Sequence, residues 1–140
     1  MKKYKLVLLS MFLMLVTSCN NVKNSNISHK DIEEKINIIA LSGPLQSSNP
    51  YDYINANKEI YNELLNSPKE TFEFSMNDLI NTNASSGLKS YIESLLCSEI
   101  NIDFKYNFES AIDYLNQYKS YLNNTDKLND YDKYTKSLLK

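Results

Sequence analysis

The chain has 140 residues, of which 15 are lysine, none is arginine and 17 are acidic, so its formal net charge is −2 at pH 7. This balance argues against a nucleic-acid partner and against electrostatic adhesion to anionic lipid, because both need a basic face. The length suits one compact domain and leaves little room for a second.

The N-terminal residues have the pattern of a secretory signal peptide. Lys2, Lys3 and Lys5 precede an apolar run over residues 6–16, and small residues follow it. A basic start, a short apolar stretch and small residues at the cleavage site are the three parts of such a signal. A retained membrane span is the competing interpretation, but these eleven residues would cover about 17 Å of a hydrocarbon core of about 30 Å. We therefore expect residues 1–18 to be cleaved.

Val16-Thr17-Ser18-Cys19 resembles the lipobox of bacterial lipoproteins. The resemblance implies that Cys19 receives a diacylglycerol thioether and anchors the mature protein to the outer face of the cytoplasmic membrane. A buried Cys19 is the alternative, but a polar, asparagine-rich stretch follows it directly. We expect residues 19–29 to form a short tether. Because three of the 15 lysines lie in the signal, the mature chain carries 12 lysines against 17 acidic residues, or −5.

From residue 30 onward, apolar residues recur at spacings of three and four, which predicts helices and no convincing strand. The first helix should cover residues 30–41, after a start signal from Ser28 and Asp31. Gly43 and Pro44 should end it. Asn49 followed by Pro50 should open a second helix that runs to residue 65.

A third helix should start at Ser67-Pro68, with Ser67 and Glu70 forming a capping box. A fourth should cover residues 86–99, with one apolar face and a row of small residues opposite it: Ser86, Ser90, Ser94 and Cys97. Small side chains would let another helix approach closely. We therefore expect Cys97, which has no disulfide partner once Cys19 is acylated, to be buried between helices.

The fifth helix should cover residues 108–122 and bury Phe108, Ala111, Ile112, Leu115 and Leu122. A weaker C-terminal helix should cover residues 126–139. With two glycines and three prolines, the chain has little material for the turns of a β-protein. The sequence thus predicts an all-α fold, a small irregular bundle of five or six helices, in a single domain over residues 30–140.

The search for catalytic chemistry yields no complete site. His29 is the only histidine, so a histidine-based triad or a histidine-rich zinc site lacks its residues. The acidic pairs Glu33/Glu34, Glu70/Glu73 and Asp130/Asp132 suit solvated helix faces and loops. We expect a non-enzymatic protein with no cofactor and no bound metal. A cell-wall-active enzyme or inhibitor that uses carboxylates in a cleft is the alternative.

Tyrosine is the one over-represented residue type that could serve a function, with eleven copies in the chain and no tryptophan. Tyrosines suit binding surfaces, because a ring can pack on a ligand while the hydroxyl stays hydrated. They also suit ordinary packing on amphipathic helices. The sequence leaves both readings open.

The segment from Ser42 to Asn57, with its SSNPxDYI core, resembles a module of uncharacterised lipoproteins of Gram-positive gut bacteria. A similar stretch occurs in the extracytoplasmic tails of membrane-embedded zinc metallopeptidases of the antibiotic-sensor type. The resemblance covers residues 38–100 and implies a sensing or binding appendage for a protein or cell-envelope ligand. The candidate binding residues are Ser47, Ser48, Asn49, Tyr51, Asp52 and Tyr53. These residues also have a structural explanation as a loop and a helix start.

Overall fold

A computed structural model describes residues 27–44 and 47–140. Within these ranges the chain forms seven α-helices and no strand, which confirms the all-α prediction. The helices are α2 (His29–Leu41), α3 (Pro50–Ala56), α4 (Lys58–Leu65), α5 (Pro68–Asn81), α6 (Leu88–Ile100), α7 (Ala111–Asn124) and α8 (Asp130–Leu138). The predicted signal over residues 1–18, the modification of Cys19 and most of the tether lie outside the described residues. None of the helices within those ranges is long and apolar enough to cross a membrane.

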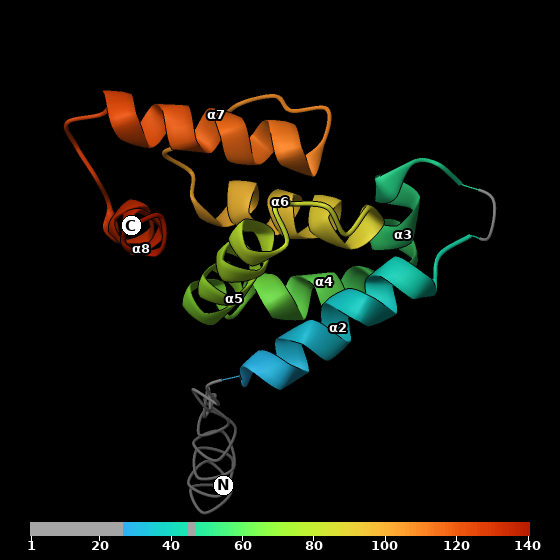
Figure 1. Cartoon of the computed structure of the whole chain (residues 1–140). Coiled ribbons are helices and arrows are strands. Elements are labelled where there is room, and N and C mark those ends of the chain that lie inside the picture. Colours follow the sequence, from blue (N-terminus) through green and yellow to red (C-terminus); the bar gives the residue numbers. More distant parts are fainter. Residues whose placement is uncertain (1–26, 45–46) are drawn as a thin grey trace, which may run out of the picture.

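Helix α6 lies at the centre of the bundle (Figure 1). On one side, α2, α3 and α4 pack against it around a core that includes Ile32, Ile36 and Leu64. On its other side, α5, α7 and α8 enclose a second core, which includes Phe72, Phe104 and Tyr118. Because α6 contributes to both cores, it joins the two halves of an irregular bundle.

The start of α2 confirms the predicted capping box. The Ser28 side chain accepts a hydrogen bond from the Asp31 backbone N–H, and the Asp31 carboxylate accepts one from the Ser28 N–H. The predicted second helix, in contrast, is two helices with a break at Asn57. The Asn57 backbone leaves helical geometry, and its side-chain amide donates to the Tyr53 carbonyl. This break accounts for a seventh helix where we expected five or six.

The capping box predicted at the start of α5 does not form. Pro68 occupies the first turn as predicted, but Ser67 makes no side-chain cap. Ser67 sits at φ −122° and ψ 62°, outside the extended conformation of most capping residues.

Most of the predicted small-residue face of α6 is buried as expected, but Ser86 precedes the helix and is exposed. Ser90, Ser94 and Cys97 have no exposed surface, and α5 packs more extensively against α6 than any other helix does. The predicted start at residue 86 is slightly early, because Gly87 precedes the helix at φ 61° and ψ −127°. Such a conformation suits glycine and strains other residues.

The buried face of α7 differs from the predicted one. The helix begins at Ala111 rather than at Phe108, and Ile112 is 48% exposed. Tyr114 and Tyr118 are fully buried in its place. The sequence pattern favoured isoleucine over tyrosine for the interior. In the fold, Asn101 and Asp132 form hydrogen bonds with the Tyr118 hydroxyl, which offsets the cost of burying it.

Candidate ligand-binding surface

The predicted binding segment forms the loop and the first turn before and within α3. Ser47 donates its hydroxyl proton to the Asp52 carboxylate, and Asn49 accepts from the Tyr51 backbone N–H at 3.2 Å. The Tyr53 hydroxyl donates to the Ser47 carbonyl at 3.0 Å. The polar groups of this segment therefore bond to one another and hold the loop and the start of α3 in place. These hydrogen bonds support the structural explanation of the six residues.

Three residues of this segment face solvent. Ser48 and Asn49 are exposed, and Tyr51 is 51% exposed. Tyr53 instead turns inward and packs on Gly43, where an added Cβ would overlap with its ring. The structure therefore brings the six predicted residues together but leaves few of their polar groups free for a ligand.

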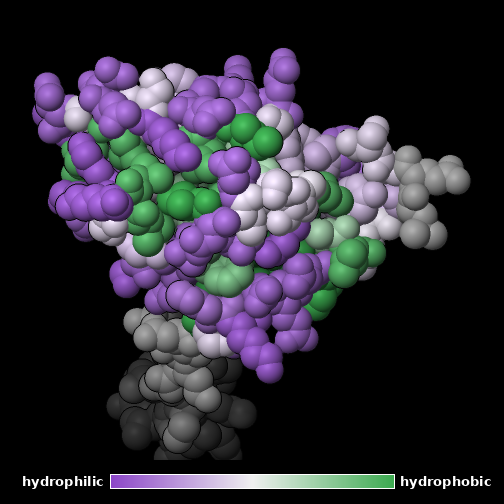
Figure 2. All heavy atoms as spheres, in the orientation of Figure 1, coloured by the Kyte–Doolittle hydropathy of each residue, from purple (hydrophilic) through white to green (hydrophobic). Residues whose placement is uncertain are grey.

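A groove of about 380 Å³ lies elsewhere, where α5, the C-terminal end of α6 and α8 meet. We call it the α8 groove. Its lining residues are Lys69, Glu73, Ile100, Asn101, Ile102, Asp103, Asn129, Asp130, Tyr131 and Tyr134. In the space-filling view of Figure 2, apolar surface gathers on the side of the molecule where α7 and α8 lie, and hydrophilic side chains interrupt it.

The α8 groove is backed by a buried polar cluster around Asp132, which has no exposed surface. Its Oδ1 atom accepts from the Tyr118 hydroxyl at 2.6 Å and from the Asn101 amide at 2.9 Å. Its Oδ2 atom accepts from the Asn129 backbone N–H at 3.1 Å. Every one of these donors is uncharged, so the carboxylate is solvated by the protein without a cation.

Asn129 connects this cluster to the groove wall. Its side-chain amide donates to Asn101 Oδ1 at 2.8 Å and to Asp103 Oδ2 at 2.9 Å, while its own Oδ1 caps α8 at the Asp132 N–H. Both amide protons are thus used, and the positions of three side chains depend on one another. The floor of the groove is therefore held in one arrangement before any ligand arrives.

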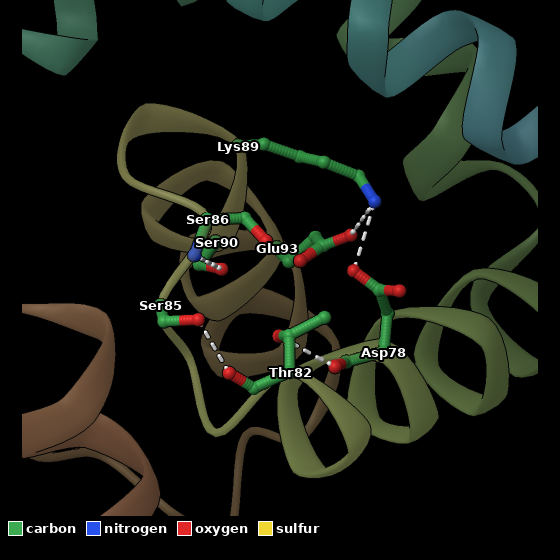
Figure 3. A network of polar contacts seen from close by, with 7 residues as sticks. All are labelled: Asp78, Thr82, Ser85, Ser86, Lys89, Ser90 and Glu93. Atoms are coloured by element: carbon green, nitrogen blue, oxygen red, sulfur yellow. Dashed lines mark hydrogen bonds and ion pairs between the residues drawn. The ribbon is translucent and has the colours of Figure 1, made fainter.

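A second polar cluster lies between α5 and α6, away from the groove lining (Figure 3). The Lys89 Nζ atom is 2.8 Å from Asp78 Oδ2 and 3.5 Å from Glu93 Oε1. Glu93 has no exposed surface, and neither of its carboxyl oxygens has a hydrogen bond of normal geometry. Burial raises the pKa of Glu93 to about 8, with the Asp78 charge acting in the same direction and Lys89 against it.

The facing carboxyls of Glu93 and Asp78 have the chemistry that the carboxylate-enzyme alternative requires. They lie in the packed α5–α6 interface, however, and Glu93 has no exposed surface through which a substrate could reach it. Most carboxyls of the acidic pairs named from the sequence are, in contrast, at least partly exposed to solvent. Glu33 and Glu34 are exposed, and Asp130 is exposed beside the buried Asp132.

Sequence reasoning missed the two buried carboxyls, and only Asp132 left a clear signal. Asn129 and Asp132 have the spacing of a capping box, which would have placed the start of α8 and distinguished Asp132 from Asp130. Glu93 lies among the small residues Ser90, Ser94 and Cys97, on the side of α6 that we expected to pack. Nothing in the local pattern marks it as buried, since its neighbour Lys89 at i−4 suits a solvated ion pair equally well.

The tyrosines divide between the two readings. Tyr61, Tyr114 and Tyr118 are buried, as ordinary packing requires. Tyr51 and Tyr106 are about half exposed, at 51% and 52%, but they lie on different segments and line no common hollow. Tyr131 and Tyr134 are partly buried and line the α8 groove.

No protein-family model matches this chain, and comparison with curated proteins and with solved structures finds no similar protein. The resemblances to bacterial lipoproteins and to metallopeptidase tails therefore stay predictions.

Proposed function

We propose that this protein is a lipid-anchored, extracytoplasmic binding module that holds a protein or cell-envelope ligand in the α8 groove without catalysing a reaction. The address comes from the signal pattern and from the lipobox-like Cys19. Helix α2 begins at His29, and residues 20–28 are all that separate it from Cys19, so such an anchor would keep the helical body near the membrane surface.

The observation that carries the binding role is the α8 groove. It combines two isoleucines, two tyrosines and six polar or charged side chains over a floor fixed by the Asp132 cluster. Ligand sites are typically largely preformed hollows in which placed polar groups set specificity. The predicted segment 47–53 offers less, because its polar groups already bond to one another.

We favour binding over catalysis because, among the described residues, the carboxyl with a strongly raised pKa is inaccessible. Groups with perturbed pKa values mark catalytic sites when they lie in a cleft. Glu93 has no exposed surface, and its position between two helices suits a structural or proton-linked role.

The anchor is tested by metabolic labelling with a clickable fatty acid in cells that express the wild type or Cys19→Ala. We expect label on the wild type and none on the variant. Label on both proteins would refute the lipidation of Cys19.

The binding site is tested by photo-crosslinking in the intact envelope. A benzophenone amino acid replaces Ile102, which is 66% exposed in the α8 groove, or Ile112, which is 48% exposed outside it. We expect a discrete adduct from position 102 and none from position 112. Equal labelling from both positions, or from neither, would remove the α8 groove as the binding site.

A further inference from the structure

We infer that the α8 groove binds a lysine or arginine side chain presented by a protein partner. This inference rests on the proposed function, because it names the chemistry of the ligand that the groove takes. Three features of the groove support it: its charge, the buried carboxylate behind it and its apolar and aromatic walls.

The groove lining is negative. It contains Glu73, Asp103 and Asp130 against the single lining cation Lys69, a balance of −2. Lys133 lies outside the lining and forms an exposed pair with Asp130 at 3.1 Å, so the balance that includes it is −1. Lys69 pairs with Glu73 at 3.3 Å, and its side chain is 71% exposed. An exposed pair of this kind contributes little, so an incoming cation competes with it easily.

Asp132 adds a further negative charge from beneath the groove. It makes no ion pair among the described residues, and its hydrogen-bond donors are neutral side chains and a backbone N–H. Water screens a buried charge less than an exposed one. The field of Asp132 therefore reaches a ligand in the groove and favours a cation there.

The walls suit the stem of a basic side chain. Ile100 and Ile102 provide apolar surface for methylene groups. The rings of Tyr131 and Tyr134 are suitable partners for an ammonium or guanidinium group. The groove volume of about 380 Å³ lies near the lower end of the range for small-ligand sites. It therefore suits inserted side chains better than a large ligand.

The experiment measures the binding of a fluorescent tetralysine peptide to the full chain in neutral detergent at low ionic strength. The same peptide with every lysine acetylated keeps its length but loses its charge. Asp103→Asn combined with Asp130→Asn removes two charges from the groove. Glu33→Gln combined with Glu34→Gln removes two exposed charges from α2 and is the matched control.

We expect the groove variant to raise the Kd about fivefold and the control to change it less than about twofold. Acetylation should abolish binding. Asp130→Asn alone keeps the Asp103–Asn129 hydrogen bond and should weaken binding about twofold, which covers the case in which the double variant fails to fold. Asp103→Glu with Asp130→Glu, which retains both charges, should bind within about twofold of the wild type.

Equal weakening by the groove variant and the control would overturn the inference, because it would indicate general attraction to an acidic protein. Binding of the acetylated peptide with unchanged affinity would also overturn it. If tetralysine does not bind while position 102 still forms its adduct in the envelope, the groove takes a ligand of another chemistry and the proposed function stands. If both fail, the proposed function falls as well.

Discussion

The Lys89 ammonium lies 3.5 Å from Glu93 Oε1, and this is the one ion pair that Glu93 makes within the described part of the chain. Lys89 is closer to Asp78, at 2.8 Å. One cation therefore faces two carboxyls, one of which is fully buried. Unless Glu93 keeps its proton, the α5–α6 interface holds an excess negative charge.

We predict that this arrangement makes the protein less stable as the pH rises. The folded-state pKa of Glu93 is about 8, against a reference value of 4.5, so the folded state binds the proton more tightly than the unfolded state. The contribution of Glu93 to stability is greatest below about pH 4.5, declines as the pH rises to about 8, and is constant above that. The groups that face it are Asp78 on α5 and Lys89 and Cys97 on α6.

Glu93→Gln should remove this dependence and stabilise the protein at pH 9 by up to about 5 kcal/mol relative to the wild type. The measurement is urea unfolding at a series of pH values. Glu33→Gln, an identical change on the exposed face of α2, is the control and should leave the profile unchanged. Parallel profiles for the wild type and Glu93→Gln would show that folding does not shift the pKa of Glu93, which would contradict the prediction.

We predict that Asp132→Ala lowers the free energy of unfolding by about 3 kcal/mol. The substitution leaves the Tyr118 hydroxyl, an Asn101 amide proton and the Asn129 backbone N–H without their acceptor in a buried site. Chemical denaturation measures the loss. Asp130→Ala, two residues earlier at a 98% exposed side chain, should cost less than about 1 kcal/mol. Similar losses for the two variants would contradict the importance of the buried cluster.

We predict that Gly43→Ala destabilises the protein by about 1–3 kcal/mol, because the new methyl group collides with the Tyr53 ring. Most of this penalty should disappear when Tyr53→Ala is introduced as well, so a double-mutant cycle should give a clear coupling energy. Gly87→Ala provides the contrast. It meets no atom within 4 Å but is strained at φ +61°, so Tyr53→Ala should not rescue it.

We predict that the native protein reacts very slowly with a thiol reagent, because Cys97 has no exposed surface and burial raises its thiol pKa well above the ordinary value. After unfolding in urea, one thiol per chain should react if Cys19 is acylated. Two reactive thiols per unfolded chain would show that Cys19 is unmodified. Rapid reaction of the native protein would show that the α5–α6–α7 interior opens.

Part of the fold is determined by patterns within single segments. The spacing of Ile32, Ile36 and Ile39 defines the inner face of α2, and Ser28 with Asp31 sets its start through hydrogen bonds three residues apart. The helical class follows from the same short-range periodicity. The exported, lipid-anchored state, if labelling confirms it, is likewise encoded in the first 19 residues.

The candidate site depends on tertiary structure. Asp132 meets Asn101 and Tyr118, residues 31 and 14 positions away in the sequence, and Asp130 stays in solvent. Tyr134 joins α8 to Glu73 across 61 positions. Local periodicity reports only which face of a helix is apolar. Whether a polar side chain on that helix is buried depends on donors and charges brought from distant segments. Tertiary packing therefore determined that Glu93, Tyr118 and Asp132 are buried.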